Sequence, residues 1–345
     1  MIAIVADRWS PPAAGGGREH YAHALVAHLR AGGHTVVTLM SGDKLPADAS
    51  AVLALTPLAT ATHYQLHGGL LDAAFAGERA AFSSALRRQL YAPALALNQR
   101  RQRLLAAEST MLAGATTFMA FSNADAERLA ARGVHPSRVR VQRPGVDLSR
   151  FRPGDPPSTP DSSLPRPLRL LFVAHNTVLK GLRTAILAVG RARQRGIDAS
   201  LLVAGRGVGS RERRLIDREG LSAAIRTEGE ASPDRLASLY RTADALIHPT
   251  FYDPFPRVCI EALASGCPVL TTASCGAAEI VRHGCEGFIV ADPRDVDGFA
   301  EAIRTVASTS ARRLRHAAAA LGQQFDDGAH FRDVAEWLAG TSAAR

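Results

Sequence analysis

Short apolar runs alternate with helical segments along both halves of this 345-residue chain. The first half opens with the run Ile2–Ala6, followed by a helical pattern over 18–30 and a further run over 35–39. Parallel strands joined by crossover helices produce this alternation. We therefore predict an α/β protein with a doubly wound, Rossmann-like parallel sheet in each half. The other predicted strands are 51–55, 118–120, 168–174, 199–204, 245–248, 268–272 and 287–290, with helices around 72–88, 94–113 and 123–131.

A proline-rich segment over 152–167 separates the two halves. It contains six prolines, and proline disrupts both regular helices and central strands. We predict an interdomain linker there, between an N-terminal domain over 1–151 and a C-terminal domain over 168–325. Residues 326–345 are expected to hold a final helix, near 330–339.

Charge and hydropathy limit the classes of function. The formal net charge of +9 suits nucleic acid, an anionic membrane or a phosphorylated substrate as partner. No nucleic-acid-binding motif supports the first of these. No apolar run approaches the roughly 20 residues of a membrane-spanning helix, and Met1 leads into a strand instead of a signal peptide, so a cytoplasmic location is expected. The cysteines lack the spacing of a zinc site and are expected to be buried, reduced thiols: Cys259, Cys267, Cys275 and Cys285.

Two carboxylates are prominent in the segment 245–282. Asp253 lies in a loop after a predicted strand, and Glu261 lies on a helix expected to begin near Val258, with seven residues between the two acids. Taken alone, they are simply a surface-loop acid and a solvated helix acid. Their surroundings favour a sugar-nucleotide site, because helix N-terminal amides can hold a diphosphate and carboxylates can accept hydrogen bonds from sugar hydroxyls.

The segment resembles the E-x7-E signature of the retaining, family-4 glycosyltransferases of GT-B fold (glycosyl transferases group 1), with Asp in the first position. The run 266–276 is similar to bacterial relatives of the lipopolysaccharide core glucosyltransferases. The resemblance implies that Glu261 binds the nucleotide ribose. It also implies a second set of donor-binding residues around the sugar and diphosphate: Asp253, Phe255, Arg257 and Val258.

The loop after the predicted strand 168–174 carries a second part of the resemblance. Lys180 matches the lysine with which the family binds the departing diphosphate, although a lone lysine there is usually just solvated. The family's arginine is absent, with His175 or Asn176 near its place, and Arg257 is a further candidate to replace it. Pro256 also departs from the family pattern, which has glycine there, and it removes one backbone donor.

Two elements in the first half complete the resemblance. Gly16 and Gly17 follow the first strand, where the family packs backbone against the donor's diphosphate and sugar. His67 matches a family histidine that reaches the sugar, although a surface or core role fits it equally well. The resemblance further implies an acceptor-binding N-terminal domain, a donor-binding C-terminal domain, a central cleft between them, and a final helix that crosses back to the first domain.

These features predict a glycosyltransferase of cell-envelope polysaccharide synthesis. We expect it to move a hexose from a nucleoside diphosphate sugar, with UDP as the nucleotide, to a saccharide or lipid-linked acceptor with retention of configuration. No cofactor or metal is expected, because Asp295 and Asp297 stand at a helix start, where capping is the simpler role. A same-fold epimerase or phosphorylase and a non-catalytic nucleotide-sugar-binding protein are the alternatives.

The stretch from Arg79 to Arg103 contains six arginines and no acid, interleaved with leucines and aromatic residues. Pro93 is expected to divide it into two helices. A solvated basic face on packed helices explains this pattern. The alternative is an amphipathic surface that docks on an anionic membrane, which would place the protein peripherally at the inner face of that membrane.

Overall fold

The computed structural model describes residues 1–7, 9, 17–154 and 166–340, and it divides into two compact units. The first unit combines Met1–Gly145 with the C-terminal segment that begins at Asp327, and the second is Val146–Asp326. The predicted linker lies outside the described residues except for its two ends. Residues 146–151, which the sequence analysis places in the N-terminal domain, belong instead to the second unit, where the Val146 N–H donates to the Phe325 carbonyl at 2.9 Å.

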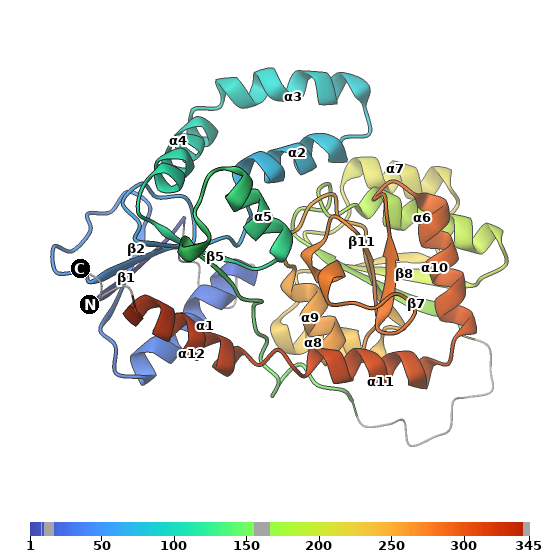
Figure 1. Cartoon of the computed structure of the whole chain (residues 1–345). Helices are drawn as coiled ribbons and strands as arrows, with labels where there is room; N and C mark the ends of the chain where they lie inside the picture. The colour runs from blue at the N-terminus through green and yellow to red at the C-terminus, as the bar shows by residue number, and fades with distance from the viewer. Residues whose placement is uncertain (8, 10–16, 155–165, 341–345) are drawn as a thin grey trace. The chain divides into compact units, whose positions relative to one another are not determined.

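The first unit contains a six-stranded parallel sheet, of which Figure 1 labels β1, β2 and β5. Its strand order is β2-β1-β3-β4-β5-β6. The first of these strands is buried along its whole length, which explains its unbroken apolar sequence. β4 and β6 were not predicted, because three residues are too few to establish a period and both strands carry polar side chains. The strands are β1 (Ile2–Ala6), β2 (Val36–Met40), β3 (Ala51–Ala54), β4 (His63–Gln65), β5 (Thr117–Ala120) and β6 (Val139–Val141).

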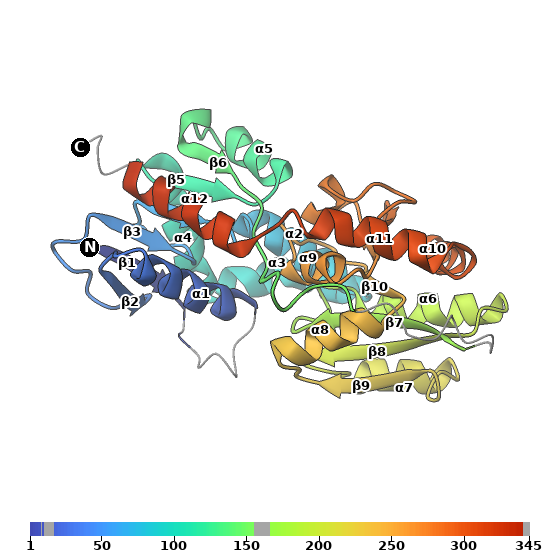
Figure 2. The same cartoon turned by 90° about the horizontal axis from the view of Figure 1, so that it is seen from below.

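The final helix of the chain packs into this first unit. It contacts α1 and β3 (Figure 2), and the rings of Tyr21 and Phe331 lie 5.4 Å apart between centroids. The helices of the unit are α1 (Gly17–Ala31), α2 (Leu71–Ala81), α3 (Ala85–Leu97), α4 (Gln99–Ala113), α5 (Asn123–Ala131) and α12 (Asp327–Gly340).

The prediction that Pro93 separates two helices is wrong. Pro93 lies inside α3, and the chain breaks instead at 82–84 and at Asn98. The Asn98 side chain accepts a hydrogen bond from the Arg101 N–H at 3.0 Å and so caps the start of α4. Since α3 is exposed, water can satisfy the carbonyl that a proline leaves unbonded, and the helix continues through it.

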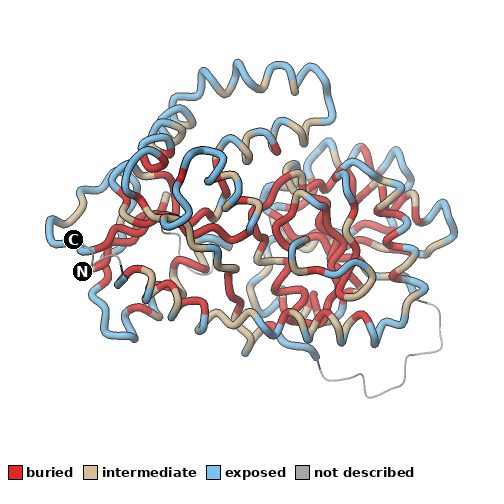
Figure 3. Tube along the Cα trace, viewed as in Figure 1, coloured by how far each residue is buried: buried red, intermediate tan, exposed pale blue. Residues whose placement is uncertain are grey.

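The second unit contains a second six-stranded parallel sheet, in the order β12-β11-β10-β7-β8-β9. The predicted strands are present, and only β9, in which Ile225 is the one large apolar residue, was not predicted. Buried residues are concentrated along both sheets (Figure 3). The strands are β7 (Leu168–Ala174), β8 (Ala199–Gly205), β9 (Ile225–Gly229), β10 (Ala245–His248), β11 (Val269–Thr272) and β12 (Gly287–Val290).

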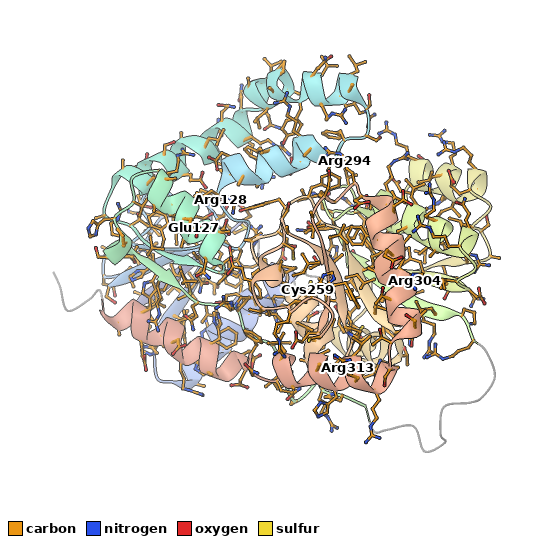
Figure 4. The ribbon with its side chains drawn as sticks, turned by 45° about the vertical axis from the view of Figure 1, so that its right-hand side comes forward. Glu127, Arg128, Cys259, Arg294, Arg304 and Arg313 are labelled. Carbon is orange, nitrogen blue, oxygen red and sulfur yellow. The ribbon has the colours of Figure 1, made fainter. Side chains whose placement is uncertain are left out.

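Helices pack on both sides of this sheet. One group consists of α6 and α10, which contact each other; α6 also contacts β8, and α10 also contacts β12. The second group consists of α8, α9 and α11, of which α9 contacts β10 and β11. Asp295 caps α10 by accepting from the Gly298 N–H at 2.8 Å, as predicted. Cys259, labelled in Figure 4, is fully buried on α9. The helices are α6 (Leu182–Gln194), α7 (Ser210–Arg218), α8 (Pro233–Thr242), α9 (Arg257–Ala264), α10 (Val296–Ser308) and α11 (Ala311–Gly322).

None of the helices in the described ranges combines the length and the apolar character that crossing a membrane requires.

Candidate functional site

The candidate site lies where the strand order of the second sheet reverses. From β7 the chain first builds outward through β8 and β9, and then returns to place β10 on the other side of β7. The loops that follow β7 and β10 therefore begin side by side, at the carboxyl ends of two neighbouring strands. Ligands of doubly wound sheets bind at such a point. Lys180 lies in the first of these loops and Asp253 in the second.

Backbone contacts join the two loops directly. The Phe251 N–H donates to the Leu179 carbonyl at 2.9 Å. Gly181 has a φ of +77°, and a Cβ there would collide with the Pro249 carbonyl oxygen. Only glycine allows this backbone conformation together with so close an approach. The requirement for Gly181 thus sets the position of the neighbouring Lys180.

A third loop, between β11 and β12, supports the Asp253 segment. The Gly276 N–H donates to the Asp253 carbonyl at 2.8 Å, and the Asp253 N–H donates to the Ser274 carbonyl at 3.3 Å. A Cβ on Gly276 would collide with the Pro254 carbonyl oxygen. The glycine of the Cys-Gly sequence therefore has a structural role, because it lets the two loops pack backbone to backbone.

Lys180 and Asp253 form an ion pair. The Lys180 Nζ lies 2.5 Å from Asp253 Oδ2 and also donates to the Tyr252 carbonyl at 3.2 Å. The two side chains are 19% and 10% exposed, so the pair is shielded from most of the solvent. Burial raises the pKa of the Asp253 carboxyl, but the Lys180 charge and the His248 ring outweigh burial, and the net pKa is below its usual value.

His248 is a member of the site that the sequence analysis did not assign. It is the last residue of β10, it is buried, and its Nε2 lies 3.3 Å from Asp253 Oδ2. Burial lowers the pKa of its imidazole, with Asp253 opposing and Lys180 reinforcing this shift. A neutral ring can donate its Nε2–H to the carboxylate and orient it. The one sequence signal for this role was a polar residue at the carboxyl end of a buried strand.

A second cluster lies at the start of α9. Pro256 is the N-cap of this helix, and Arg257 is its first residue. Glu261 is buried, and it accepts a hydrogen bond from the Tyr240 hydroxyl at 3.2 Å, while Arg257 Nε lies 3.8 Å from its Oε1. A buried carboxylate held in this way is pre-oriented. Tyr240, which is far from this helix in sequence, was not expected in the site.

The other residues predicted from the C-terminal half have different surroundings. Phe255 is buried and Val258 is half-buried at the beginning of α9. His175 is more than half exposed, and its Nδ1 lies 3.8 Å from Glu230 Oε1. A carboxylate thus lies beside the His175 ring, and the proposed replacement of the family arginine by His175 stays a prediction.

Three of the predicted residues belong to the first unit. Gly17 begins α1, while Gly16 lies outside the described residues. His67 follows β4, and its Nε2 lies 3.3 Å from Gln65 Oε1. Gln65 Nε2 donates to the Tyr21 hydroxyl at 2.8 Å, and this hydroxyl lies 2.8 Å from the His330 Nε2 of α12. His67 is thus the outer member of a mostly buried chain of polar side chains.

Residues 161–323 match the family described as glycosyl transferases group 1, and this match covers most of the second unit. The second unit belongs to this family. The resemblance to glycosyl transferases group 1 is therefore confirmed for this unit. The chain is 35% identical over 204 residues to D-inositol 3-phosphate glycosyltransferase 2 of Catenulispora acidiphila, a match that covers 54% of this chain and 48% of that protein.

Glycogen synthase of Mycobacterium tuberculosis is a second relative, 34% identical over 196 residues that cover 55% of this chain and 45% of that protein. The chain thus spans about half the length of the curated relatives it matches. Among solved structures, WaaG, a glycosyltransferase involved in lipopolysaccharide biosynthesis, has a TM-score of 0.76 at 19% identity, covering 99% of this chain and 100% of that chain.

Another similar structure is Anabaena HepE in complex with UDP and glucose, with a TM-score of 0.71 at 17% identity, covering 98% of this chain and 99% of that one. These likenesses establish the GT-B fold, with a Rossmann-like parallel sheet in each unit. Both residue clusters described above lie inside the group 1 domain. Lys180, His248 and Asp253 form one, and Tyr240, Arg257 and Glu261 form the other.

Proposed function

We propose that this chain is a glycosyltransferase that moves a hexose from a UDP-sugar to a saccharide or lipid-linked acceptor with retention of configuration. The observation that carries the proposal is the Lys180–Asp253 ion pair at the strand-order reversal of a group 1 domain. A cation and a carboxylate beside a helix N-terminus suit the diphosphate and the hydroxyls of a sugar nucleotide. HepE, which shares the fold, has been solved with UDP and glucose, and this favours UDP as the nucleotide.

The second cluster suits the nucleotide half of such a donor. A ribose presents two neighbouring hydroxyls, and a carboxylate can accept a hydrogen bond from each. Glu261 has two carboxylate oxygens, of which Oε2 accepts from Tyr240 and Oε1 faces Arg257. We assign ribose binding to Glu261, with Tyr240 and Arg257 as residues that position it. Phe255 and Val258 would form the floor between the ribose and the sugar.

The first cluster suits the reacting half. An ammonium group has three hydrogens, and Lys180 uses one for Asp253 and one for the Tyr252 carbonyl, which leaves one for a diphosphate oxygen. Charge develops on that diphosphate as the glycosidic bond breaks through an oxocarbenium-like transition state. A positioned cation stabilises this charge more than it stabilises the ground state. Asp253 would hold hydroxyls of the transferred hexose.

In this proposal the first unit binds the acceptor, and His67, Gly16 and Gly17 contribute to the sugar end of the donor. Positive charge from Lys180 and from the amides at the start of α9 takes the place of a metal ion. Pro256 supplies no N–H at this position, so these amides begin at Arg257. Fewer backbone donors also fit a second candidate, a protein that binds nucleotide sugars without turning them over.

A panel of nucleotide hexoses separates the two candidates. The full chain is incubated with UDP-, GDP-, ADP- and dTDP-hexoses and a set of saccharide and lipid-linked acceptors, and release of nucleoside diphosphate is measured. We expect acceptor-dependent release from a UDP-hexose, lost in Glu261→Gln and retained in Glu301→Gln, an exposed helix carboxylate of the same unit. Binding of a nucleotide sugar by calorimetry without any release would establish the second candidate. The anomeric configuration of the product, read by NMR, tests retention.

A further inference from the structure

α3 exposes large apolar side chains to solvent. None of its residues is buried, and the trace of α3 is largely coloured as exposed in Figure 3. Leu86, Leu90 and Leu97 are 62%, 55% and 83% exposed. The sequence allowed either packed helices or an amphipathic docking surface here, and only packed helices would bury these leucines. Exposed leucines in such number along a single helix are unusual for a surface that faces only water.

These leucines share one face of the helix. Positions 86, 90, 93 and 97 are spaced i, i+4, i+7 and i+11, so Pro93 completes a continuous stripe with the three leucines. We call Leu86, Leu90, Pro93 and Leu97 the α3 stripe. At the helical rise the stripe is about 15–20 Å long.

The opposite face of α3 holds the helix on the first unit. Arg88 Nη1 donates to the Phe82 carbonyl at 2.7 Å. The Tyr91 hydroxyl donates to Glu78 Oε2 at 2.6 Å and accepts from Arg101 Nη1 at 2.7 Å. The helix is therefore fixed with its polar contacts toward α2 and α4 and its apolar stripe directed away from them.

Arginines are concentrated in and next to α3 along the chain. Six arginines and no acid lie over 79–103. Arg87 and Arg103 form no ion pair with any residue that the structure describes, and Arg100 is 77% exposed and 3.8 Å from Asp7. A second copy of the chain is a poor match for this face, because pairing stripe to stripe would bring the arginines of both copies together.

An apolar stripe flanked by arginines suits the interface of an anionic membrane, where leucines enter the acyl region and guanidinium groups meet lipid phosphates. We propose that α3 is a membrane-docking helix that lies in the plane of an anionic bilayer and inserts the α3 stripe. The contact differs from a purely electrostatic one in its response to salt. Screening weakens the arginine contribution, whereas burial of the leucines is not screened. Part of the binding should therefore survive at high salt.

Vesicle co-sedimentation tests the proposal with the full chain and two lipid compositions, pure phosphatidylcholine and a mixture of phosphatidylglycerol with phosphatidylcholine. The parent protein should sediment with the anionic vesicles and much less with the neutral ones. The triple variant Leu86→Ser, Leu90→Ser, Leu97→Ser keeps every charge, and its partition should fall about tenfold or more at all salt concentrations. Arg87→Gln with Arg103→Gln should lose mainly the salt-sensitive part.

The matched control is Met40→Ser with Val141→Ser, which removes two other exposed apolar side chains of the first unit and should bind like the parent. Because every substituted side chain is exposed, circular dichroism should show an unchanged fold in all variants. Equal sedimentation of the parent and the leucine variant would overturn the proposal, as would a parent that ignores anionic vesicles at low salt. A parent that is dimeric, with a leucine variant that is monomeric and no vesicle binding by either, would assign the stripe to a second copy instead.

Discussion

Lys180 Nζ lies 2.5 Å from Asp253 Oδ2, although the two residues are 73 positions apart in the chain. Each follows one of the two central strands, β7 and β10, and backbone contacts between their loops hold the pair in place. Removing either partner should therefore have two effects. It changes the proposed chemistry, and it leaves the other, mostly buried partner without its counter-ion.

Lys180→Ala should abolish transfer and also destabilise the second unit. Loss of a cation that stabilises a departing diphosphate costs about 2–4 kcal/mol of transition-state stabilisation. The variant also leaves the Asp253 carboxylate without its counter-ion, and breaking a buried pair in this way costs about 3 kcal/mol of folding stability. Steady-state kinetics and thermal unfolding measure the two losses separately.

The double variant Lys180→Met, Asp253→Asn is the control for this experiment. Since it removes both charges together, we expect it to recover most of the thermal stability without recovering transfer. A well-folded Lys180→Ala protein with the parent's kcat/KM would show that Lys180 has no part in the reaction.

Glu261→Ala should weaken binding of the bare nucleoside diphosphate, because its proposed partner is the ribose and not the sugar. A hydrogen bond to a charged group contributes about 1.5–3 kcal/mol, which corresponds to a roughly tenfold to hundredfold rise in Kd. Titration calorimetry with UDP is the measurement. Tyr240→Phe, which removes only the 3.2 Å contact to Glu261, should have a smaller effect in the same direction. Equal affinities of Glu261→Ala and parent for UDP would refute the assignment.

Glu108 should make the stability of the first unit depend on pH. This buried carboxyl on α4 accepts the Leu71 N–H at 3.0 Å, at the start of α2. Burial, reinforced by Asp72, raises its pKa to about 7. Because the pKa of Glu108 is raised in the folded state, the contribution of Glu108 to stability is complete below its pKa in the unfolded chain, about 4.5. This contribution is lost as the pH rises through 7.

Glu108→Gln keeps an acceptor for the Leu71 N–H but does not titrate. The difference in unfolding free energy between the parent and this variant should therefore change by about 2–3 kcal/mol between pH 4 and pH 8, to the disadvantage of the parent at the higher pH. Denaturant unfolding across this range measures it, and the other titrating groups cancel in the difference. Parallel pH profiles for the two proteins would contradict the raised pKa.

Transfer should persist in EDTA. In the proposed mechanism Lys180 and the α9 amides supply the positive charge that stabilises the departing diphosphate. The measurement is nucleoside diphosphate release before and after chelation. Activity that disappears with EDTA and returns with magnesium or manganese would reveal a metal requirement.

Some of these features could be predicted from the sequence because they depend on local patterns. The apolar runs of β1, β7 and β10 are long enough to indicate buried parallel strands, and Asp295 stands where a helix cap is expected. Lys180 and Asp253 each come just after a predicted strand, which already indicated that both residues lie at the same edge of one sheet. Local sequence therefore determined the fold class, the two-unit organisation and the loops that carry the site.

The tertiary structure decided which of these groups meet. The ion pair of Lys180 with Asp253, the approach of His248 and the contact of Tyr240 with Glu261 all depend on strand order, which no local pattern encodes. The same holds for α3, where the pattern of leucines indicates an apolar face but not the direction in which it points. Such contacts join residues far apart in the chain, and their energies arise only when burial brings the side chains together.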